Sequence, residues 1–321
     1  MRFIPFAAAL AILFATPGLR AQPSYPDRPV RIIAGSSAGG TADLVARIIA
    51  DNLGRKLNGR FIVENVPGNS GGIAAVQVAR APADGYTLML AAINSHAILP
   101  AMQPNLRYDP VKDFAPVSLV SFSPNLLMVH PSLGVRSIPD LIALLKKDPG
   151  KYNYGSGGVG TSQHLAMEIF LASTDTRATH VPFAGSGQLL TALVGNTVHM
   201  AFDTMTTGIR HVRQGNLGGL GVSSAKRSAA APDMAAVAEF VPGFDVVAWN
   251  GVLAPAGTPR PIVERLSRAI GEIMHTPEIA DRFGQMGTTP VGSTPEEFGA
   301  HMASDLKKFR EVVKTADIKA E

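Results

Sequence analysis

Apolar positions follow two periods along this chain, short buried runs and longer stretches at helical spacing. The short runs predict strands at 30–34, 61–64, 87–92, 126–130, 152–154, 179–183, 199–202 and 219–223. The helical spacing predicts helices at 41–57, 71–80, 137–147, 161–173, 187–195, 205–214, 260–275, 277–286 and 295–315. Strands and helices in this alternating order are typical of an α/β protein with largely parallel sheets.

Two extended segments, Val117–His130 and Val246–Pro255, are placed to carry the chain between domains. A chain of 321 residues exceeds one comfortable hydrophobic core, so we expect two domains. If both segments cross, one domain comprises residues 22–121 plus 250–321 and the other comprises 122–249. A ligand cleft would then lie beneath the two crossings. A single large sheet with two irregular loops is the alternative.

The first 21 residues have the features of a secretory signal. Arg2 precedes an apolar run from Phe3 to Ala15, and Pro17 breaks the run before a small residue, Ala21. We expect export to the periplasm with cleavage near Ala21; an uncleaved anchor is the alternative. The chain contains no cysteine, which excludes disulfides and a lipidated N-terminal cysteine.

The charge pattern narrows the class of ligand. The formal net charge of +4 falls to about +2 once Arg2 and Arg20 leave with the signal, and no Lys/Arg run forms a basic stripe. Nucleic-acid binding is therefore not expected. The eight histidines show no metal-ligand spacing, so we predict no metal site and no cofactor. A mild positive bias favours an acidic small molecule.

Two glycine-rich turns, far apart in sequence, each link a predicted strand to a helix N-terminus. Such a turn binds anions well, because unpaired backbone N–H groups and the helix dipole point into it. The candidate ligand-binding residues are Ser36, Ser37, Ala38, Gly39, Gly40 and Thr41 in the first turn, and Ser156, Gly160, Thr161 and Ser162 in the second. Together they predict a cleft that holds a carboxylate-bearing molecule from two sides.

Both turns also match motifs of enzymes. Gly35–Gly39 fits GxSxG, which would make Ser37 the nucleophile of a secreted serine hydrolase, but no upstream strand and loop exist to complete an oxyanion hole. Gly155–Gly160 fits the GxGxxG of dinucleotide-binding proteins, but the strand before it is short and polar. We therefore predict a binding protein with no catalytic residue and keep the hydrolase as the competing class.

A series of segments in order resembles the Bug family, the periplasmic solute-binding receptors of tripartite tricarboxylate transporters. The segments are YPDRPVRII, AGGTADLVAR, ENVPGNSGGIAA, ADGYTLML, DPGKYNYGSGGVGTSQHLAMEIF, THVPFAGSGQLLTALVGN, HMAFDTM, RQGNLGGLGVSSAKR and WNGVLAPAGTP. The resemblance covers the chain from Tyr25 to the last helix. It implies a type II periplasmic-binding-protein fold, with two α/β domains that close on a di- or tricarboxylate, an acidic amino acid or an aromatic acid.

The resemblance also implies partners and further cleft residues. The partners would be two integral membrane transporter subunits, with the receptor itself a monomer; a receptor that feeds a membrane sensor is the alternative. Strand-end loops of the family place Asn94, Ser95, His96, Phe183, Ala184 and Asp203 at the cleft. For His96 a buried role is equally open, for Phe183 a core role, and for Asp203 a helix N-cap.

One departure from the family concerns the first turn. The family pattern has a proline and a phenylalanine where this chain has Gly35 and Ser36. The change removes an apolar wall and adds hydroxyl groups, so we expect a more polar or roomier pocket. His164 and Trp249, the only tryptophan, are expected to be structural.

Overall fold

The computed structural model describes residues 25–315, so the predicted signal peptide lies outside the described residues. Its strands are β1 (Val30–Ala34), β2 (Phe61–Asn65), β3 (Thr87–Ala92), β4 (Phe114–Val129), β5 (Asn153–Ser156), β6 (Thr179–Pro182), β7 (Met200–Thr204), β8 (Gly218–Val222), β9 (Ala235–Ala236), β10 (Val247–Pro255) and β11 (Thr289–Pro290). Its α-helices are α1 (Thr41–Leu57), α2 (Gly72–Ala79), α3 (Leu99–Met102), α4 (Ile138–Lys147), α5 (Ser162–Thr174), α6 (Ser186–Val194), α7 (Met205–Arg213), α8 (Arg260–Met274), α9 (Pro277–Gln285) and α10 (Pro295–Thr315). Short turns of 3-10 helix at Asn69–Gly71, Pro131–Leu133 and Val237–Glu239 and a π-helical turn at Asn94–Ile98 complete the elements.

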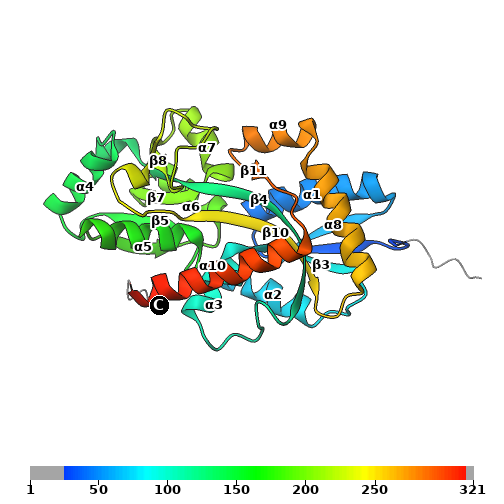
Figure 1. The fold of residues 1–321 in the computed structure, drawn as a ribbon. Helices are drawn as coiled ribbons and strands as arrows, with labels where there is room; N and C mark the ends of the chain where they lie inside the picture. Colours follow the sequence, from blue (N-terminus) through cyan, green and yellow to red (C-terminus); the bar gives the residue numbers. More distant parts are fainter. Residues whose placement is uncertain (1–24, 316–321) are drawn as a thin grey trace, which may run out of the picture.

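The strands form two groups that share two long strands. In the first group, β2, β1 and β3 run parallel, and β10 joins β3 in the antiparallel direction. In the second group, β7, β5 and β6 run parallel, and β8 lies against β4. We call the elements around β1–β3 the first lobe and those around β5–β7 the second lobe; Figure 1 shows them on opposite sides of β4 and β10.

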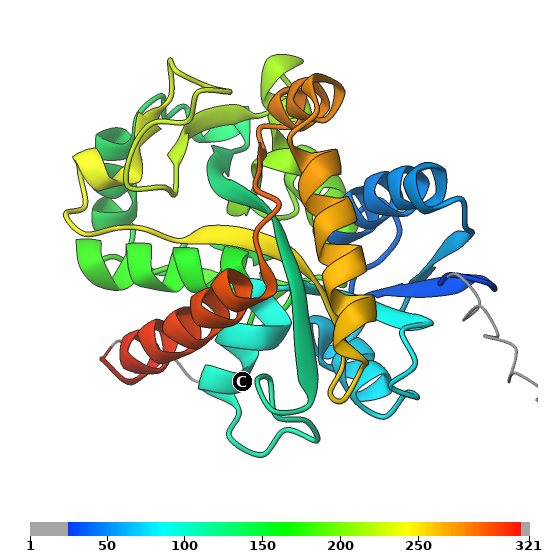
Figure 2. The same cartoon turned by 45° about the vertical axis from the view of Figure 1, so that its right-hand side comes forward.

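The long strands β4 and β10 are antiparallel partners and connect the lobes. Residues Phe114–Pro124 of β4 pair with β10, whereas Asn125–Val129 pair with β7 of the second lobe. The two segments expected to cross are thus continuous strands, and β4 begins earlier than expected. In Figure 2, α8 and α10 lie across them. The exact domain boundaries at 121/122 and 249/250 stay a prediction.

Alternation of side chains explains how each sheet buries both faces. On β1, Val30 and Ile32 pack with α1 and α8, whereas Ile33 packs with α2 and α10. On β4, Leu127 packs with α4 and α5, and its neighbours Leu126 and Met128 pack with α6 and α7. Successive strand residues point to opposite faces, so helices cover both sides of each sheet. The result is a two-lobed α/β arrangement in which β10 and β4 lie between the strands of the two lobes.

The other predicted helices and strands are found with ends shifted by at most two residues; β4, expected at 126–130, instead begins at Phe114. The segment after β3 differs, since it was expected to be a loop at the strand end. The structure forms a π-helical turn at Asn94–Ile98 that continues into α3 (Leu99–Met102). Pro100 lies within the first two residues of α3, at the junction with the π-helical turn.

Candidate functional site

A cavity of about 460 Å³ lies between the two lobes, beneath the crossing strands. Its wall is formed by the loops after β1, β2, β3, β5 and β6, together with the β10 residues Ala248, Trp249 and Asn250. In open α/β sheets, loops at the carboxyl ends of parallel strands form the ligand site. The volume suits a small organic molecule.

Five helices begin at this cavity. Residues at or next to the N-termini of α1, α2, α5, α6 and α7 form part of its wall: Thr41, Gly71, Ser162, Ser186 and Thr204. In four of the five helices, all except α5, no N-cap side chain makes a capping hydrogen bond. The first N–H groups of a helix have no intrahelical partner and carry a partial positive charge. These helix ends therefore direct partial positive charge at the cavity.

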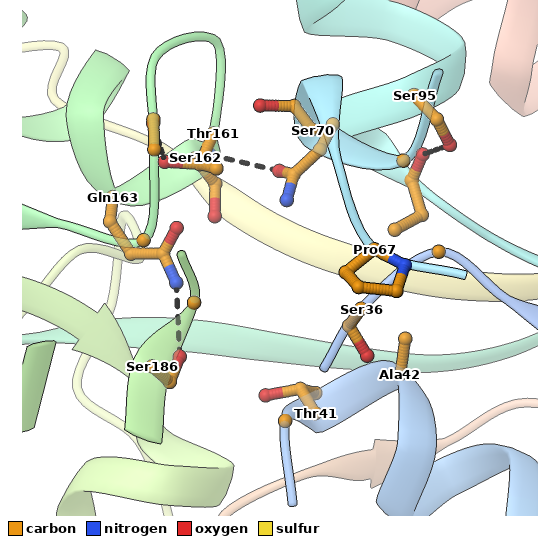
Figure 3. A pocket seen from close by; sticks show the side chains of 18 of the residues that line it. Ser36, Thr41, Ala42, Pro67, Ser70, Ser95, Thr161, Ser162, Gln163 and Ser186 are labelled. Carbon is orange, nitrogen blue, oxygen red and sulfur yellow. Dashed lines mark hydrogen bonds between the residues drawn. The ribbon is translucent and has the colours of Figure 1, made fainter. Parts of the chain in front are cut away.

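The wall combines apolar side chains, among them Leu90, Phe183 and Trp249, with polar side chains that are all uncharged. No Asp, Glu, Lys, Arg or His is among the lining residues that the structure describes. Hydroxyl and amide groups come from both lobes, and Figure 3 shows Ser36, Thr41 and Ser70 opposite Thr161, Ser162, Gln163 and Ser186. An anion bound here would therefore contact backbone N–H groups and hydroxyls, without a cationic side chain.

Hydrogen bonds join the lobes at the wall of the cavity. The hydroxyl of Ser37 donates to the carbonyl of Ala184 over 2.9 Å, and the backbone N–H of Ser162 donates to Asn94 Oδ1 over 2.9 Å. Thr41 and Thr204 hydroxyls lie 2.6 Å apart, and Ser70 donates to the carbonyl of Val159. These contacts describe a cavity closed between two lobes.

The structure brings most of the predicted site residues to this cavity. Those on its wall are Ser36, Ser37, Gly40, Thr41, Asn94, Ser95, Thr161, Ser162, Phe183 and Ala184. Thr161 also has a local role, because its hydroxyl accepts the N–H of His164 and donates to the carbonyl of Gly158. Ligand contact by any of these residues stays a prediction.

Six predicted residues lie off the wall: Ala38, Gly39, His96, Ser156, Gly160 and Asp203. Ala38 and Gly39 are exposed at the tip of the first turn, where the N–H of Gly39 donates to Asp43. Gly160 lies against Leu99 and Met102 instead. These three residues belong to turns that reach the cavity, but the residues themselves point away from it.

His96 and Ser156 are buried in the protein interior. The His96 ring packs edge-on against Phe114 with 4.7 Å between ring centres, and burial lowers its pKa to about 3. The Ser156 hydroxyl lies 2.7 Å from His180 Nε2 and also contacts the backbone of Gly158. His96 therefore adopts the buried role that was left open, and Ser156 shapes the turn from within. His164 is also buried, with its ring tilted by 30° against that of His180 and 4.4 Å between ring centres.

Asp203 is completely buried beneath the floor of the cavity. Its carboxylate accepts hydrogen bonds from Ser186, Gln163 and Thr207. The N-cap of α7 is Thr204, so the expected role of Asp203 as N-cap is corrected. Instead, Asp203 anchors two residues of the cavity wall, Gln163 and Ser186, from behind.

Several wall residues were not predicted. They are Pro67–Gly71, Gln163, Gly185, Ser186, Thr204, Trp249 and Asn250. The loop at Pro67–Gly71 carries a sequence signal, because a run of Pro, Gly, Asn and Ser soon after a predicted strand is typical of a loop at a strand end. In the structure Asn69, Ser70 and Gly71 have positive φ angles of 45°, 50° and 88°. Trp249 was expected to be structural; it is 1% exposed, and it also lines the cavity.

Ser37 has none of the surroundings of a hydrolase nucleophile. Its hydroxyl donates to a backbone carbonyl, that of Ala184, and within residues 25–315 no hydrogen bond connects it to a histidine. Those residues also contain no group of three His, Asp or Glu side chains arranged to hold a metal ion. None of the described helices combines the length and apolar character needed to cross a membrane.

The chain matches known proteins over nearly its whole length. The model of the tripartite tricarboxylate transporter family receptor matches residues 45–318. The protein BugT of Bordetella pertussis is 32% identical over 324 residues, which cover 99% of each chain.

Two solved structures from Rhodopseudomonas palustris have the same fold. The protein Rpa4515, solved with adipate, has a TM-score of 0.90 and 33% identity over 92% of this chain and 99% of that one. MatC with bound malate has a TM-score of 0.85 and 28% identity over 90% of this chain and 100% of that one. These matches confirm the resemblance to Bug receptors. The chain belongs to the family of tripartite tricarboxylate transporter receptors, which are periplasmic solute-binding proteins and not enzymes.

Proposed function

We propose that this receptor captures a small carboxylate by closure of its two lobes and delivers it to a membrane transporter. The observation that carries the proposal is a closed cavity at which five helix N-termini meet and which has no charged side chain on its described wall. Helix N-termini stabilise an anion through N–H groups and the helix dipole. Two similar receptors were solved with the dicarboxylates adipate and malate.

The binding cycle follows from the position of the cavity. A carboxylate would first dock on the turn of one lobe, around Ser36–Thr41 or Thr161–Ser162, and closure would bring the other turn onto its far end. Each charge-assisted hydrogen bond contributes about 1.5–3 kcal/mol, so three or four can offset desolvation and closure. The cavity volume of about 460 Å³ then limits the length of the acid.

The proposal also covers the location, the oligomeric state and the transport partners of the receptor. We infer export to the periplasm with cleavage near Ala21, action as a monomer, and delivery to two integral membrane subunits. The family supports the role in transport. The lobes would move as the domains 22–121 plus 250–321 and 122–249, with β4 and β10 as the hinge.

A thermal-shift screen of residues 22–321 tests the proposal. The protein is unfolded and refolded first, to remove any retained ligand, and then screened against C3–C6 dicarboxylates, citrate, acidic amino acids and aromatic acids. A ligand at 100 times its Kd stabilises the protein by about 2.7 kcal/mol, which raises Tm by several degrees. Sugars and NAD are the controls. A shift with sugars alone would contradict the proposal.

A further inference from the structure

One buried amide at the cavity has an acceptor without a partner. Gln163, the second residue of α5, lines the cavity and is only 6% exposed. Its Nε2 donates to Asp203 Oδ1 over 3.0 Å and to Ser186 Oγ over 3.4 Å. Its Oε1 is buried and has no hydrogen-bond partner among residues 25–315. Figure 3 shows the amide nitrogen directed at Ser186 and the oxygen turned away from it.

The orientation of this amide is determined by its two neighbours. Ser186 donates its only hydroxyl proton to Asp203 Oδ1 over 2.6 Å, so it presents lone pairs to Gln163. Asp203 Oδ1 is also an acceptor. If the amide were reversed, Gln163 Oε1 would face two oxygens that have no proton to offer. Both amide protons are therefore used on Asp203 and Ser186, and the oxygen is left for the cavity.

This orientation of Gln163 requires an Asp203 carboxylate that accepts hydrogen bonds, and the groups around Asp203 are hydrogen-bond donors. Thr207 donates to Oδ2 over 2.7 Å, and the backbone N–H of Thr204 also donates to the carboxylate. Burial is the largest influence and leaves the pKa of Asp203 raised, although hydrogen bonds from Ser186, Thr207, Gln163 and the backbone of Thr204 oppose the rise. Every partner donates, as around an ionised carboxylate. Asp203 thus acts as a positioning residue for Gln163.

A second unpartnered polar atom lies on the other lobe. Ser36 Oγ is buried without a hydrogen-bond partner within residues 25–315. A hydroxyl can donate to a ligand carboxylate, whereas Gln163 Oε1 can only accept. The two atoms therefore need different ligand groups. Ser36 Oγ, in the first lobe, can donate to an acceptor, whereas Gln163 Oε1, in the second lobe, needs a donor.

We propose that Gln163, oriented by Asp203 and Ser186, selects acids that carry a hydroxyl or ammonium group in addition to the carboxylate. The inference rests on the proposed carboxylate-binding function and deepens it. A fully ionised, unsubstituted dicarboxylate has no proton to donate, so it leaves a buried acceptor unpaired. An unpaired buried acceptor is costly, and a site built around a hydrogen bond rejects analogues that lack the group.

The test compares matched acids by titration calorimetry on refolded wild-type protein. The series are succinate, malate and aspartate, then glutarate, 2-hydroxyglutarate and glutamate. Within a series, we expect at least one substituted acid to bind about 10-fold or more tightly than the unsubstituted one. The hydroxy and amino acids in each series distinguish the two kinds of donor.

A variant shows whether Gln163 is responsible. Gln163→Met keeps the length of the side chain and removes its acceptor. The ratio of the affinity for the substituted acid to that for the unsubstituted acid should therefore fall to about one, while the unsubstituted acid still binds. Gln77→Met on the exposed face of α2 is the matched control and should keep the wild-type preference. Asp203→Asn provides a second variant, because an amide at position 203 lets Gln163 turn; the preference should again decrease.

The outcomes separate the two proposals. If unsubstituted acids bind as tightly as their substituted partners to the wild-type protein, the donor inference is overturned and the carboxylate receptor stands, whether or not the variants fold. Retention of the preference in a folded Gln163→Met protein would overturn it as well. If no acid in either series or in the wider panel binds, both proposals fail.

Discussion

At the residue scale, orientation separates side chains that the sequence presents as equivalent. Ser156 and Thr161 belong to one glycine-rich turn, yet Ser156 bonds inward to His180 and Thr161 lies on the cavity wall. Sequence spacing predicted that the turn contributes to the site. It could not predict which hydroxyls face inward, because that depends on how the turn is rotated against the neighbouring strand.

Trp249 offers a direct optical signal at this scale. It is the only tryptophan in the chain, it lines the cavity, and its Nε1 donates to Asp305 over 2.7 Å. Ligand binding should change the intensity or wavelength of its fluorescence, because the environment of the ring changes. A titration with the best ligand from the thermal-shift screen checks this. Constant emission at a ligand concentration that saturates the calorimetric signal would show that Trp249 does not sense the ligand.

His96 predicts a loss of stability in acid. Burial lowers its pKa to about 3 in the folded protein, whereas an unfolded histidine titrates near 6.5. Between these values the unfolded chain binds a proton that the folded protein refuses, so the free energy of unfolding decreases as the pH falls from 6.5 to 3. The full effect of one such group is about 1.4 kcal/mol per pH unit.

The variant His96→Phe tests this account. Urea unfolding measured across the same pH range should show a shallower decrease in stability; His164, whose pKa is lowered to about 4, accounts for part of what remains. His275→Gln, at an exposed position, controls for the removal of a histidine. An unchanged slope in His96→Phe would mean that His96 is not the source of the acid sensitivity.

At the element scale, hydrophobic periodicity predicted the strands and helices well, and close backbone packing was invisible to it. A Cβ at Gly35 would lie 2.8 Å from the Cα of Gly71, so the turns after β1 and β2 touch backbone to backbone. This contact explains why a residue without a side chain occupies position 35. The π-helical turn at Asn94–Ile98 was also missed, because a π-turn has no hydrophobic period of its own.

Gly35→Ala should therefore destabilise the protein by about 1–3 kcal/mol, since the neighbouring atom belongs to the backbone and cannot rotate away. Denaturant unfolding measures the change. Gly284→Ala in α9 is the control, because its Cβ would meet nothing within 4 Å; helical alanine should raise stability there by up to about 1 kcal/mol. Equal stability of Gly35→Ala and wild type would show that the turns can separate.

At the scale of the whole molecule, two long strands and contacts across the cavity connect the lobes. The sequence predicted both crossing segments from their length and apolar character. It could not predict that Asn94 accepts the N–H of Ser162, because the partners are far apart in sequence and belong to different lobes. The loop at Pro67–Gly71 was missed as part of the cavity for the same reason.

Ser37→Ala tests the role of contacts across the cavity. The variant removes the hydroxyl that donates to the carbonyl of Ala184. A hydrogen bond contributes about 0.5–1.5 kcal/mol, so ligand affinity should fall roughly 2- to 10-fold, as calorimetry would measure. Ser224→Ala, which removes an exposed hydroxyl bonded to Lys226, should keep the wild-type affinity. A Ser37→Ala protein that binds as tightly as wild type would exclude this bond from closure.

The most direct test of the account is a crystal structure of the protein with the acid that gives the largest thermal shift. The account predicts that the acid occupies the cavity between the lobes, with a carboxylate bound by backbone N–H groups and hydroxyls at the N-termini of α1 or α5. Binding of the acid outside this cavity, or by charged side chains elsewhere, would contradict it.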